Sequence, residues 1–247
     1  MLRFSTRRGA TALRPFPQGA AVLVRIRLTV PDRPGSLGLV ASAIGCAGAD
    51  VVQLEVLSSE NGRAVDDVHV TVHDGGHLDR LVRSLGAVAG VGVEGVLHSP
   101  PPVTGHAELE LVARVLAAPA RALITLVDGV CAAVGADWAV VLGATAEGSL
   151  DTVVLAGVSA PEPDSLPGGL AAGLPLRLGT PRLAGPDGTR YGGAAVVPLG
   201  NAPLALLVVR QAGPAFHRSE LWRLAELGRI AGHLVDSGTL AATAGQA

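Results

Sequence analysis

The sequence predicts an α+β protein with two domains, and three observations lead to this prediction. Residues 22–98 show strand and helix patterns in the order strand, helix, strand, strand, helix, strand. Three consecutive prolines then stiffen the chain at residues 100–102. Beyond them, helical patterns at both ends enclose a second group of strands. At 247 residues, the chain is long enough for two domains with separate cores.

The first domain is predicted over residues 20–98. Its opening strand alternates, with apolar residues on one face and Arg25, Arg27 and Thr29 on the other. An Asn-Gly pair at residues 61–62 is the strongest short hairpin signal, so the strands on either side of it should pair. The complete order is that of a ferredoxin-like α+β sandwich. Strands are predicted at 22–30, 51–60, 64–73 and 91–98, and helical spacing runs through 37–49 and 78–88.

The second domain is predicted over residues 106–240, after a proline-rich linker at 99–105. Two helical segments, separated at Pro119, should open it. The segment 159–193 is rich in proline and glycine and should hold at most a short helix and an edge strand. Strands are predicted at 138–145, 152–159, 194–200 and 202–210, a closing helix at 219–240, a disordered extension at 1–19 and a flexible tail at 241–247.

Composition and charge narrow the class of function. Apolar residues make up 49% of the chain and charged residues 16%, which is typical of a globular protein. Aromatic residues are only 2% and the net charge is -2, so we expect no nucleic-acid partner. No stretch approaches the roughly 20 apolar residues of a membrane span, so we expect no membrane partner.

Residue usage also indicates a cellular setting. Cys46 and Cys131 lie far apart among small apolar residues, where a free cysteine usually acts as a small hydrophobe. This use of cysteine favours a reducing cytoplasm. The chain has no lysine and an excess of alanine, glycine, valine and arginine, which suggests a GC-rich bacterial source.

The turn DRPGSLG, residues 32–38, offers complements to both charges of a free amino acid. Pro34 disfavours helical geometry at the residue before it, so we expect the helix to begin with Pro34 in its first turn. The unpaired backbone N–H groups at that helix start suit a carboxylate. Gly35 would let a ligand approach the backbone closely, and Asp32 would accept hydrogen bonds from an ammonium group.

This turn, followed by GADVVQLEV, NGRAVDDVHV and a second helix, resembles the ACT domain over about residues 22–98. The resemblance implies a regulatory module that binds amino acids, commonly at an interface between two copies whose sheets join or face each other. It places the ligand contacts in the first strand-to-helix loop and at the start of the second strand. These positions are Asp32, Gly35, Leu37, Asp50 and Val51. The alternative is a well-capped corner in a fold that only dimerises.

Four polar residues share one face of the strand predicted at 64–73. They are Asp67, His69, Thr71 and His73. In the ferredoxin-like order the first strand lies beside the third, so Arg25 and Arg27 should face this cluster. Nearby cations disfavour a metal ion, and the histidine spacing matches no recognised ligand motif. We therefore expect a solvated, salt-bridged open face and no metal.

The C-terminal half, residues 106–240, resembles a GAF-like sensory domain in its order of elements. The resemblance implies a GAF-like α/β/α fold with an antiparallel sheet. Cys131 falls in a helix, away from the usual chromophore attachment region, and we expect no cofactor. A pocket beneath the long segment would take a small apolar ligand, with Arg182, Arg190 or Tyr191 as polar contacts. The alternative is a dimerising scaffold whose opening and closing helices pack together.

The sequence contains no nucleophile elbow, P-loop, H-E-x-x-H or C-x-x-C motif, so we expect no catalytic residues. The resulting prediction is a cytoplasmic bacterial regulatory protein that forms a homodimer and senses an amino acid as its small-molecule effector. Its signal would pass to a separate output protein. Two alternatives remain: a diverged enzyme that uses the long C-terminal segment, and a purely structural dimerisation module.

Overall fold

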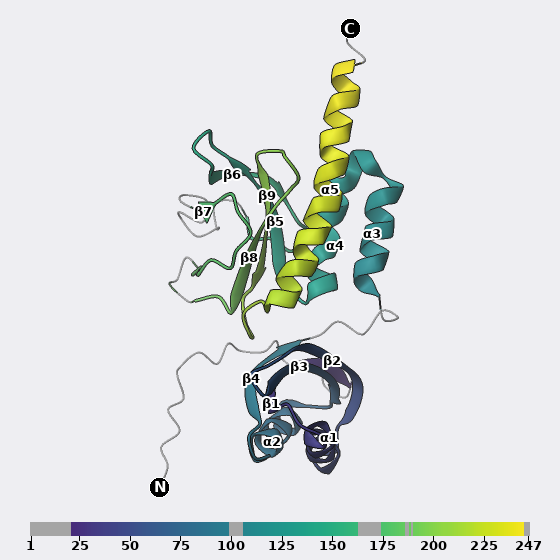
Figure 1. Ribbon diagram of the computed structural model, residues 1–247, viewed down its shortest axis with the longest axis vertical. Helices are drawn as coiled ribbons and strands as arrows, with labels where there is room; N and C mark the ends of the chain where they lie inside the picture. Colours follow the sequence, from purple (N-terminus) through teal and green to yellow (C-terminus); the bar gives the residue numbers. More distant parts are fainter. Residues whose placement is uncertain (1–20, 99–105, 163–173, 186–187, 189, 245–247) are drawn as a thin grey trace.

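The computed structural model describes residues 21–98, 106–162, 174–185, 188 and 190–244 (Figure 1). Within these residues the chain forms two sheets, each with helices packed against it. Residues 21–98 are termed the N-terminal unit, and the described residues from 106 onward the C-terminal unit. The extension predicted at 1–19 and the linker predicted at 99–105 lie outside the described residues.

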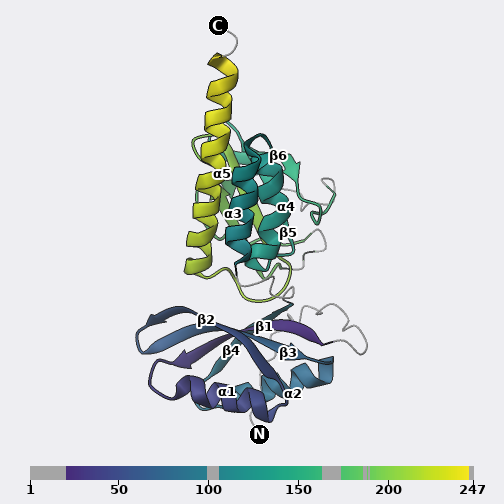
Figure 2. The ribbon, with the colours of Figure 1, turned by 90° about the vertical axis from the view of Figure 1, so that its right-hand side faces the viewer.

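The N-terminal unit has the predicted order of elements. Its four strands follow the order β2-β3-β1-β4, and each neighbouring pair is antiparallel. The two helices lie on one face of this sheet (Figure 2). The elements are β1 (Val22–Pro31), α1 (Ser36–Cys46), β2 (Asp50–Glu60), β3 (Arg63–Val72), α2 (Gly75–Gly86) and β4 (Gly92–His98). This arrangement confirms the ferredoxin-like prediction.

The core of the N-terminal unit lies between the sheet and the two helices. Ile26 and Leu28 of β1 are buried there with Val40 and Ile44 of α1. Every second residue of β1 therefore points into the core, and the residues between them point to the opposite face of the sheet. That opposite face has no helix of its own unit to cover it.

The C-terminal unit contains a curled, five-stranded antiparallel sheet with the order β7-β6-β5-β9-β8. Helices α4 and α5 pack against one of its faces, and α3 packs on the outer side of α4 (Figures 1 and 2). The break expected at Pro119 is present as a short 3-10 helix, and β7 is an edge strand, as expected. The elements are α3 (Ala107–Ala117), the 3-10 helix (Pro119–Arg121), α4 (Ala122–Val134), β5 (Trp138–Ala144), β6 (Ser149–Ala156), β7 (Leu174–Pro175), β8 (Gly193–Pro198), β9 (Leu204–Arg210) and α5 (Arg218–Ala244).

Helix α5 extends further than the sequence predicted. It continues to Ala244, so the first four residues of the predicted tail are helical. Three of residues 241–244 are alanine, the strongest helix former, which explains the extension.

The C-terminal sheet is apolar on both faces. Leu206 and Val208 of β9 face the helices, and Leu207 faces a second apolar cluster with Trp138 and Val140 of β5. All five side chains are at most 1% exposed. Because both faces are buried, the strands appear in the sequence as continuous apolar runs without alternation.

The two units meet at the open face of the N-terminal sheet. Figure 2 shows this face turned toward the C-terminal unit, with α1 and α2 on the far side. The segment between β9 and α5 lies directly against β4, because a Cβ atom added at Gly95 would be 2.8 Å from a ring carbon of Pro214. The contact between the units therefore includes close backbone packing.

Candidate functional site

The predicted ligand turn lies at the end of β1, but its helix begins later than expected. Helix α1 starts at Ser36, not around Pro34, because Gly35 adopts a left-handed conformation with φ of 89°. The backbone N–H of Ser36 donates to the carbonyl of Arg33, which closes a tight turn before the helix. No side chain caps this helix start. A Cβ atom at Gly35 would meet nothing within 4 Å, so the backbone is open on that side.

The structure does not bring all five predicted ligand residues together within one chain. Asp32, Gly35 and Leu37 lie at the end of β1 and the start of α1. Asp50 pairs with Thr71, which itself pairs with Leu23 near the start of β1. Asp50 and Val51 are therefore separated from the turn by the length of the sheet, about 30 Å. A site that uses all five residues needs a second copy of the chain.

Asp32 is exposed and is held by the end of the neighbouring hairpin. Its backbone N–H donates to the carbonyl of Gly62 over 2.9 Å, and its carboxylate accepts a hydrogen bond from the hydroxyl of Ser59. The turn is thus attached to the β2–β3 hairpin as well as to β1.

A buried carboxylate near this turn was not among the predicted site residues. Asp66 pairs with Leu28 and is 1% exposed, and neither of its carboxylate oxygens has a hydrogen-bond partner among the residues that the structure describes. Burial raises the pKa of Asp66, and the charges of Asp67 and Asp32 raise it further. Its signal in the sequence is the pair of consecutive acids in β3, which places one carboxylate on each face of the sheet.

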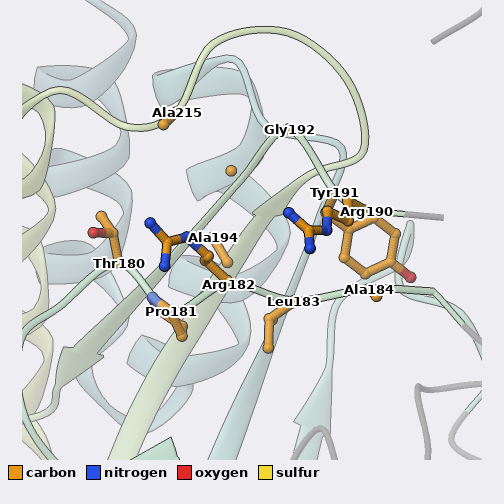
Figure 3. A pocket seen from close by; sticks show the side chains of 11 residues that line it. Thr180, Pro181, Arg182, Leu183, Ala184, Arg190, Tyr191, Gly192, Ala194 and Ala215 are labelled. Atoms are coloured by element: carbon orange, nitrogen blue, oxygen red, sulfur yellow. The ribbon is translucent and has the colours of Figure 1, made fainter. Parts of the chain in front are cut away.

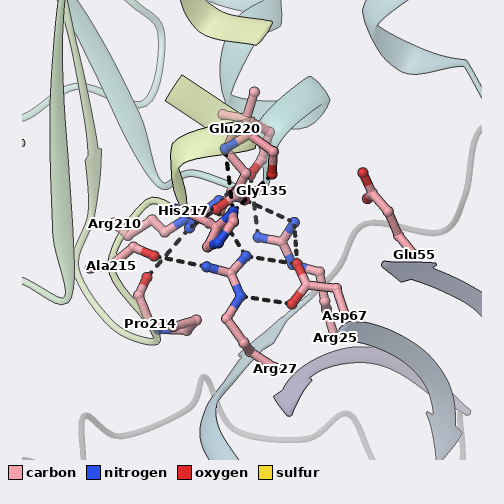
Figure 4. A network of polar contacts seen from close by, with 12 residues as sticks. Arg25, Arg27, Glu55, Asp67, Gly135, Arg210, Pro214, Ala215, His217 and Glu220 are labelled. Atoms are coloured by element: carbon pink, nitrogen blue, oxygen red, sulfur yellow. Dashed lines mark hydrogen bonds and ion pairs between the residues drawn. The ribbon is translucent and has the colours of Figure 1, made fainter. Parts of the chain in front are cut away.

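On the open face of the sheet, Arg27 joins the two units. Its guanidinium group donates two hydrogen bonds to Asp67, over 2.8 and 2.7 Å. It also donates to the carboxylate of Glu220 at the start of α5, over 2.9 Å, and to the carbonyl of Ala215, over 2.8 Å. One side chain of β1 therefore contacts both a neighbouring strand and the C-terminal unit (Figure 4).

Glu220 accepts hydrogen bonds from two arginines and a backbone N–H group, and it forms an ion pair with a third arginine. Arg210 donates to it over 2.6 Å and Arg27 over 2.9 Å, while Arg25 lies 3.5 Å away. The backbone N–H of His217 also donates to Glu220, over 2.8 Å, as in a capping box at a helix start. Glu220 and Arg210 are at most 1% exposed. The charge cluster consists of Arg25, Arg27, Asp67, Arg210 and Glu220.

The pKa values of the charge cluster reflect burial and pairing. Burial would raise the pKa of Glu220, but the hydrogen bond from Arg210 and the three arginine charges lower it to about 2. Burial would also lower the pKa of Arg27, but Asp67 and Glu220 raise it above its ordinary value. Arg210 has only one carboxylate and two nearby arginines, so burial lowers its pKa to about 10. Arg27, Arg210 and Glu220 are therefore charged near neutral pH.

The sequence predicted a solvated, salt-bridged open face. The salt bridges are present, but the prediction that water reaches this face is wrong. Arg27 and Asp67 face each other as expected, but they are 2% and 0% exposed because the C-terminal unit covers them. The alternation of β1 indicated polar side chains on that face, and it could not indicate what packs against them. Among the described residues, no group of three histidine, cysteine or acidic side chains is arranged to hold a metal ion.

Sequence reasoning missed the partners that the C-terminal unit supplies. Arg210 ends a strand of continuous apolar residues, and Glu220 lies three residues after His217 at the start of a helix. A charged residue at the end of a buried strand is a signal for an ion pair, because unpaired buried charges are costly. The sequence alone offers no means of joining that signal to Arg27, which lies more than 180 residues away.

The three polar residues predicted for the second pocket do line one pocket. Arg182, Arg190 and Tyr191 surround a cavity of about 880 Å³ between the segment before β8 and the start of that strand (Figure 3). Ala215, whose carbonyl accepts a hydrogen bond from Arg27, lines the same cavity. The remaining lining residues are Thr180, Pro181, Leu183, Ala184, Gly192, Gly193 and Ala194.

Comparison with known proteins supports a family for the N-terminal unit. Residues 19–92 match the family model of the ACT domain. ACT domains are regulatory ligand-binding modules, and a regulatory role for this chain is consistent with that match. The comparisons do not confirm the GAF-like assignment of the C-terminal unit.

Individual relatives each match part of the chain. The NAD-dependent malic enzyme of Geobacillus stearothermophilus is 35% identical over 81 residues, which cover 33% of this chain and 17% of that enzyme. The ACT domain of the GTP pyrophosphokinase of Chlorobium tepidum is 19% identical, covers 31% of this chain and 96% of that chain, and has a TM-score of 0.27. The regulatory subunit of aspartate kinase from Thermus thermophilus is 18% identical, covers 39% and 73%, and also has a TM-score of 0.27.

The helices were also compared with the requirements of a membrane span. No single helix in the described ranges is both long and apolar enough to cross a bilayer. One helix pair, Ala107–Ala117 with Pro119–Val134, meets the length and composition requirement together but is bent by 113°.

Proposed function

We propose that this chain is a non-catalytic regulatory protein that senses an amino acid at the β1–α1 turn. The observation that carries the proposal is the position of β1. One end of this strand leads into the turn, and its middle supplies Arg25 and Arg27 to the contact with the C-terminal unit. A ligand at the turn would therefore act on a strand that is already part of the contact between the units.

The chemistry of the turn supports an amino acid as the ligand. The uncapped start of α1 offers backbone N–H groups and a positive helix dipole to a carboxylate. Asp32 is exposed beside it and can accept hydrogen bonds from an ammonium group. Complements to both charges of the ligand thus occur around one turn.

We infer that a second copy completes the site. Edge strand β2 exposes four large apolar side chains: Val51, Val52, Leu54 and Val56 are 39–52% exposed. An exposed apolar edge strand is a template for pairing with another strand. Antiparallel pairing of two β2 strands about their middle would bring Asp50 of the partner subunit near Glu60, at the turn's end of the sheet. The two halves of the predicted site would then meet.

The C-terminal unit is proposed to be a GAF-like domain that receives the signal and passes it to a separate output protein. A ligand can shift this arrangement only by the difference between its affinities for the two states. The free cysteines support a reducing cytoplasm as the location, and burial raises the pKa of the Cys131 thiol to about 12, which disfavours nucleophilic chemistry there.

A thermal-shift screen of the twenty amino acids tests the sensing function. At least one amino acid should raise the melting temperature of the full chain, and Asp32→Ala and Gly35→Ala should reduce that shift. Gly148→Ala is the matched control, because Gly148 also has a positive φ, of 78°, and open space at its Cβ, but lies in the C-terminal unit between β5 and β6. The proposal fails if no amino acid shifts the transition, or if the shift is lost equally in Gly148→Ala.

The role of the second copy is tested by the oligomeric state. Val56→Lys places a charge on the exposed edge of β2, and this change should convert a dimer into a monomer in light scattering. The same variant should bind the amino acid at least tenfold more weakly, because it separates the two halves of the site. If the dimer persists in both Val56→Lys and Leu54→Lys, β2 is not the interface between the two copies.

A further inference from the structure

We propose that the pocket beside β8 binds a small organic anion through Arg182 and Arg190. This inference does not depend on amino-acid sensing at the β1–α1 turn. It also replaces the apolar ligand that the sequence predicted for this pocket.

The two arginines project from one face of a short antiparallel ladder. Ala184 pairs with Arg190, and the backbone N–H of Tyr191 donates to the carbonyl of Leu183 over 3.1 Å. Arg182 is two residues before Ala184, so it lies on the same face as Arg190 and diagonal to it. Diagonal neighbours of this kind are about 7–8 Å apart. Figure 3 shows both guanidinium groups directed into the cavity.

Neither guanidinium group is neutralised by the protein in the part of the chain that the structure describes. Arg182 and Arg190 have no ion pair and no side-chain hydrogen bond there, in contrast to Arg25, Arg27 and Arg210 of the charge cluster. Among the residues that the structure describes, none that lines the cavity carries a carboxylate. Two like charges so close together on one face are unfavourable unless an anion joins them, and a guanidinium group matches the planar geometry of a carboxylate or phosphate.

The rest of the lining indicates an organic body on that anion. Leu183, Ala184, Ala194 and Pro181 supply apolar surface, and the ring of Tyr191 is held at a centroid distance of 5.9 Å from Trp138 in an edge-to-face arrangement. The cavity volume of about 880 Å³ falls within the range of small-molecule sites and far exceeds the need of an inorganic ion. A carboxylate or phosphate on an apolar or aromatic body fits both parts of the pocket.

Matched probes test this inference by isothermal titration calorimetry on the full chain. Benzoate, phthalate and phenyl phosphate should bind, whereas benzamide, the neutral counterpart of benzoate, should not. Inorganic phosphate should bind more weakly than phenyl phosphate because it lacks the apolar body. A preference for phthalate or for phenyl phosphate identifies the anionic group, and either preference supports the proposal. Equal binding of benzoate and benzamide, or no binding of any of the three organic anions, overturns it.

Substitutions identify the residues responsible. Arg182→Gln and Arg190→Gln should each weaken the tightest probe about tenfold to a hundredfold, and the double variant should abolish binding. Both positions are exposed, so the variants should remain folded. Arg177→Gln is the matched control, since Arg177 is an exposed arginine of the same segment that does not line the pocket. Asp32→Ala should leave anion binding unchanged. Equal losses of affinity in Arg177→Gln and Arg182→Gln would show that binding depends only on the overall charge of the protein, and this result would contradict the proposal.

Discussion

The two sheets of this protein differ in the chemistry of their second face, which is the face that points away from their own helices. In the N-terminal sheet, β1 alternates between core residues such as Ile26 and charged residues such as Arg27. In the C-terminal sheet, β9 buries apolar residues on both sides, with Leu206 on one face and Leu207 on the other. Both second faces are nevertheless covered. Alternation in a strand therefore reports the chemistry of a face, and it does not report whether water reaches it.

The two sheets also pack against their surroundings through different kinds of contact. The C-terminal sheet is held by apolar contacts that are insensitive to charge, whereas the contact between the units depends on the charge cluster around Glu220. A buried cluster of this kind adds little net stability over apolar residues of the same shape, but removing one member leaves uncompensated charge. The contact is consequently specific, and it can be altered by single changes.

The largest effect is expected from Glu220→Gln. This variant leaves Arg25, Arg27 and Arg210 around a neutral amide, with one remaining carboxylate, Asp67, in the cluster. The free energy of unfolding should fall by about 3–5 kcal/mol, as measured by urea denaturation.

The control for that variant is Glu226→Gln, further along α5. Glu226 pairs with Arg229 on the surface, where an ion pair contributes less than about 1 kcal/mol. Similar losses in the two variants would show that burial of the charge cluster does not matter.

Truncation of β9 on either face should cost almost as much. Leu206→Ala and Leu207→Ala each remove a fully buried side chain, so each should lower the free energy of unfolding by about 2–5 kcal/mol. Leu54→Ala on edge strand β2, where the side chain is 39% exposed, should cost clearly less in the monomer. If only one of the two β9 variants is destabilising, the C-terminal sheet does not have two buried faces.

The smallest effect concerns pH and the histidines at the contact between the units. Burial and the charge of Arg27 lower the pKa of His217, while Glu220 and Asp67 partly oppose this, and burial and Arg25 lower the pKa of His69. The unfolded chain then binds protons more readily than the folded chain, so stability should fall as the pH drops below about 6.5.

Substitution separates the two histidines. His217 contacts the hydroxyls of Ser58 and Ser219, at 3.2 and 3.0 Å, so glutamine at this position retains a polar side chain. The loss of thermal stability between pH 7.5 and 5.5 should be smaller in His217→Gln and smaller again in the double variant with His69→Gln. An identical pH dependence in the wild type and the double variant would exclude these groups as its source.

Much of the fold could be predicted from local patterns. The alternation of β1, the Asn-Gly hairpin and the break at Pro119 are local signals, and each corresponds to an observed element. The start of α1 was predicted too early because a left-handed Gly35 is needed to close the turn, and composition alone does not reveal that conformation. Local patterns thus locate elements better than they locate the turns between them.

The candidate sites were less predictable, because they depend on contacts between distant residues. Arg182, Arg190 and Tyr191 are close in sequence, and the structure does bring them to one pocket. Asp32 and Asp50 are also close in sequence, but the length of a strand separates them. Glu220 belongs to the charge cluster through packing of the two units, for which the sequence carries no local signal.

Hydrogen exchange with and without the amino acid that gives the largest thermal shift tests the central claim most directly. Slower exchange is expected at two places in the full chain: at residues 32–39 around the turn, and at residues 211–220, which include the carbonyl of Ala215 and the carboxylate of Glu220 bound by Arg27. Asp32→Ala should remove both effects together. Protection confined to the turn, with unchanged exchange at 211–220, would contradict the proposed coupling of the ligand turn to the C-terminal unit.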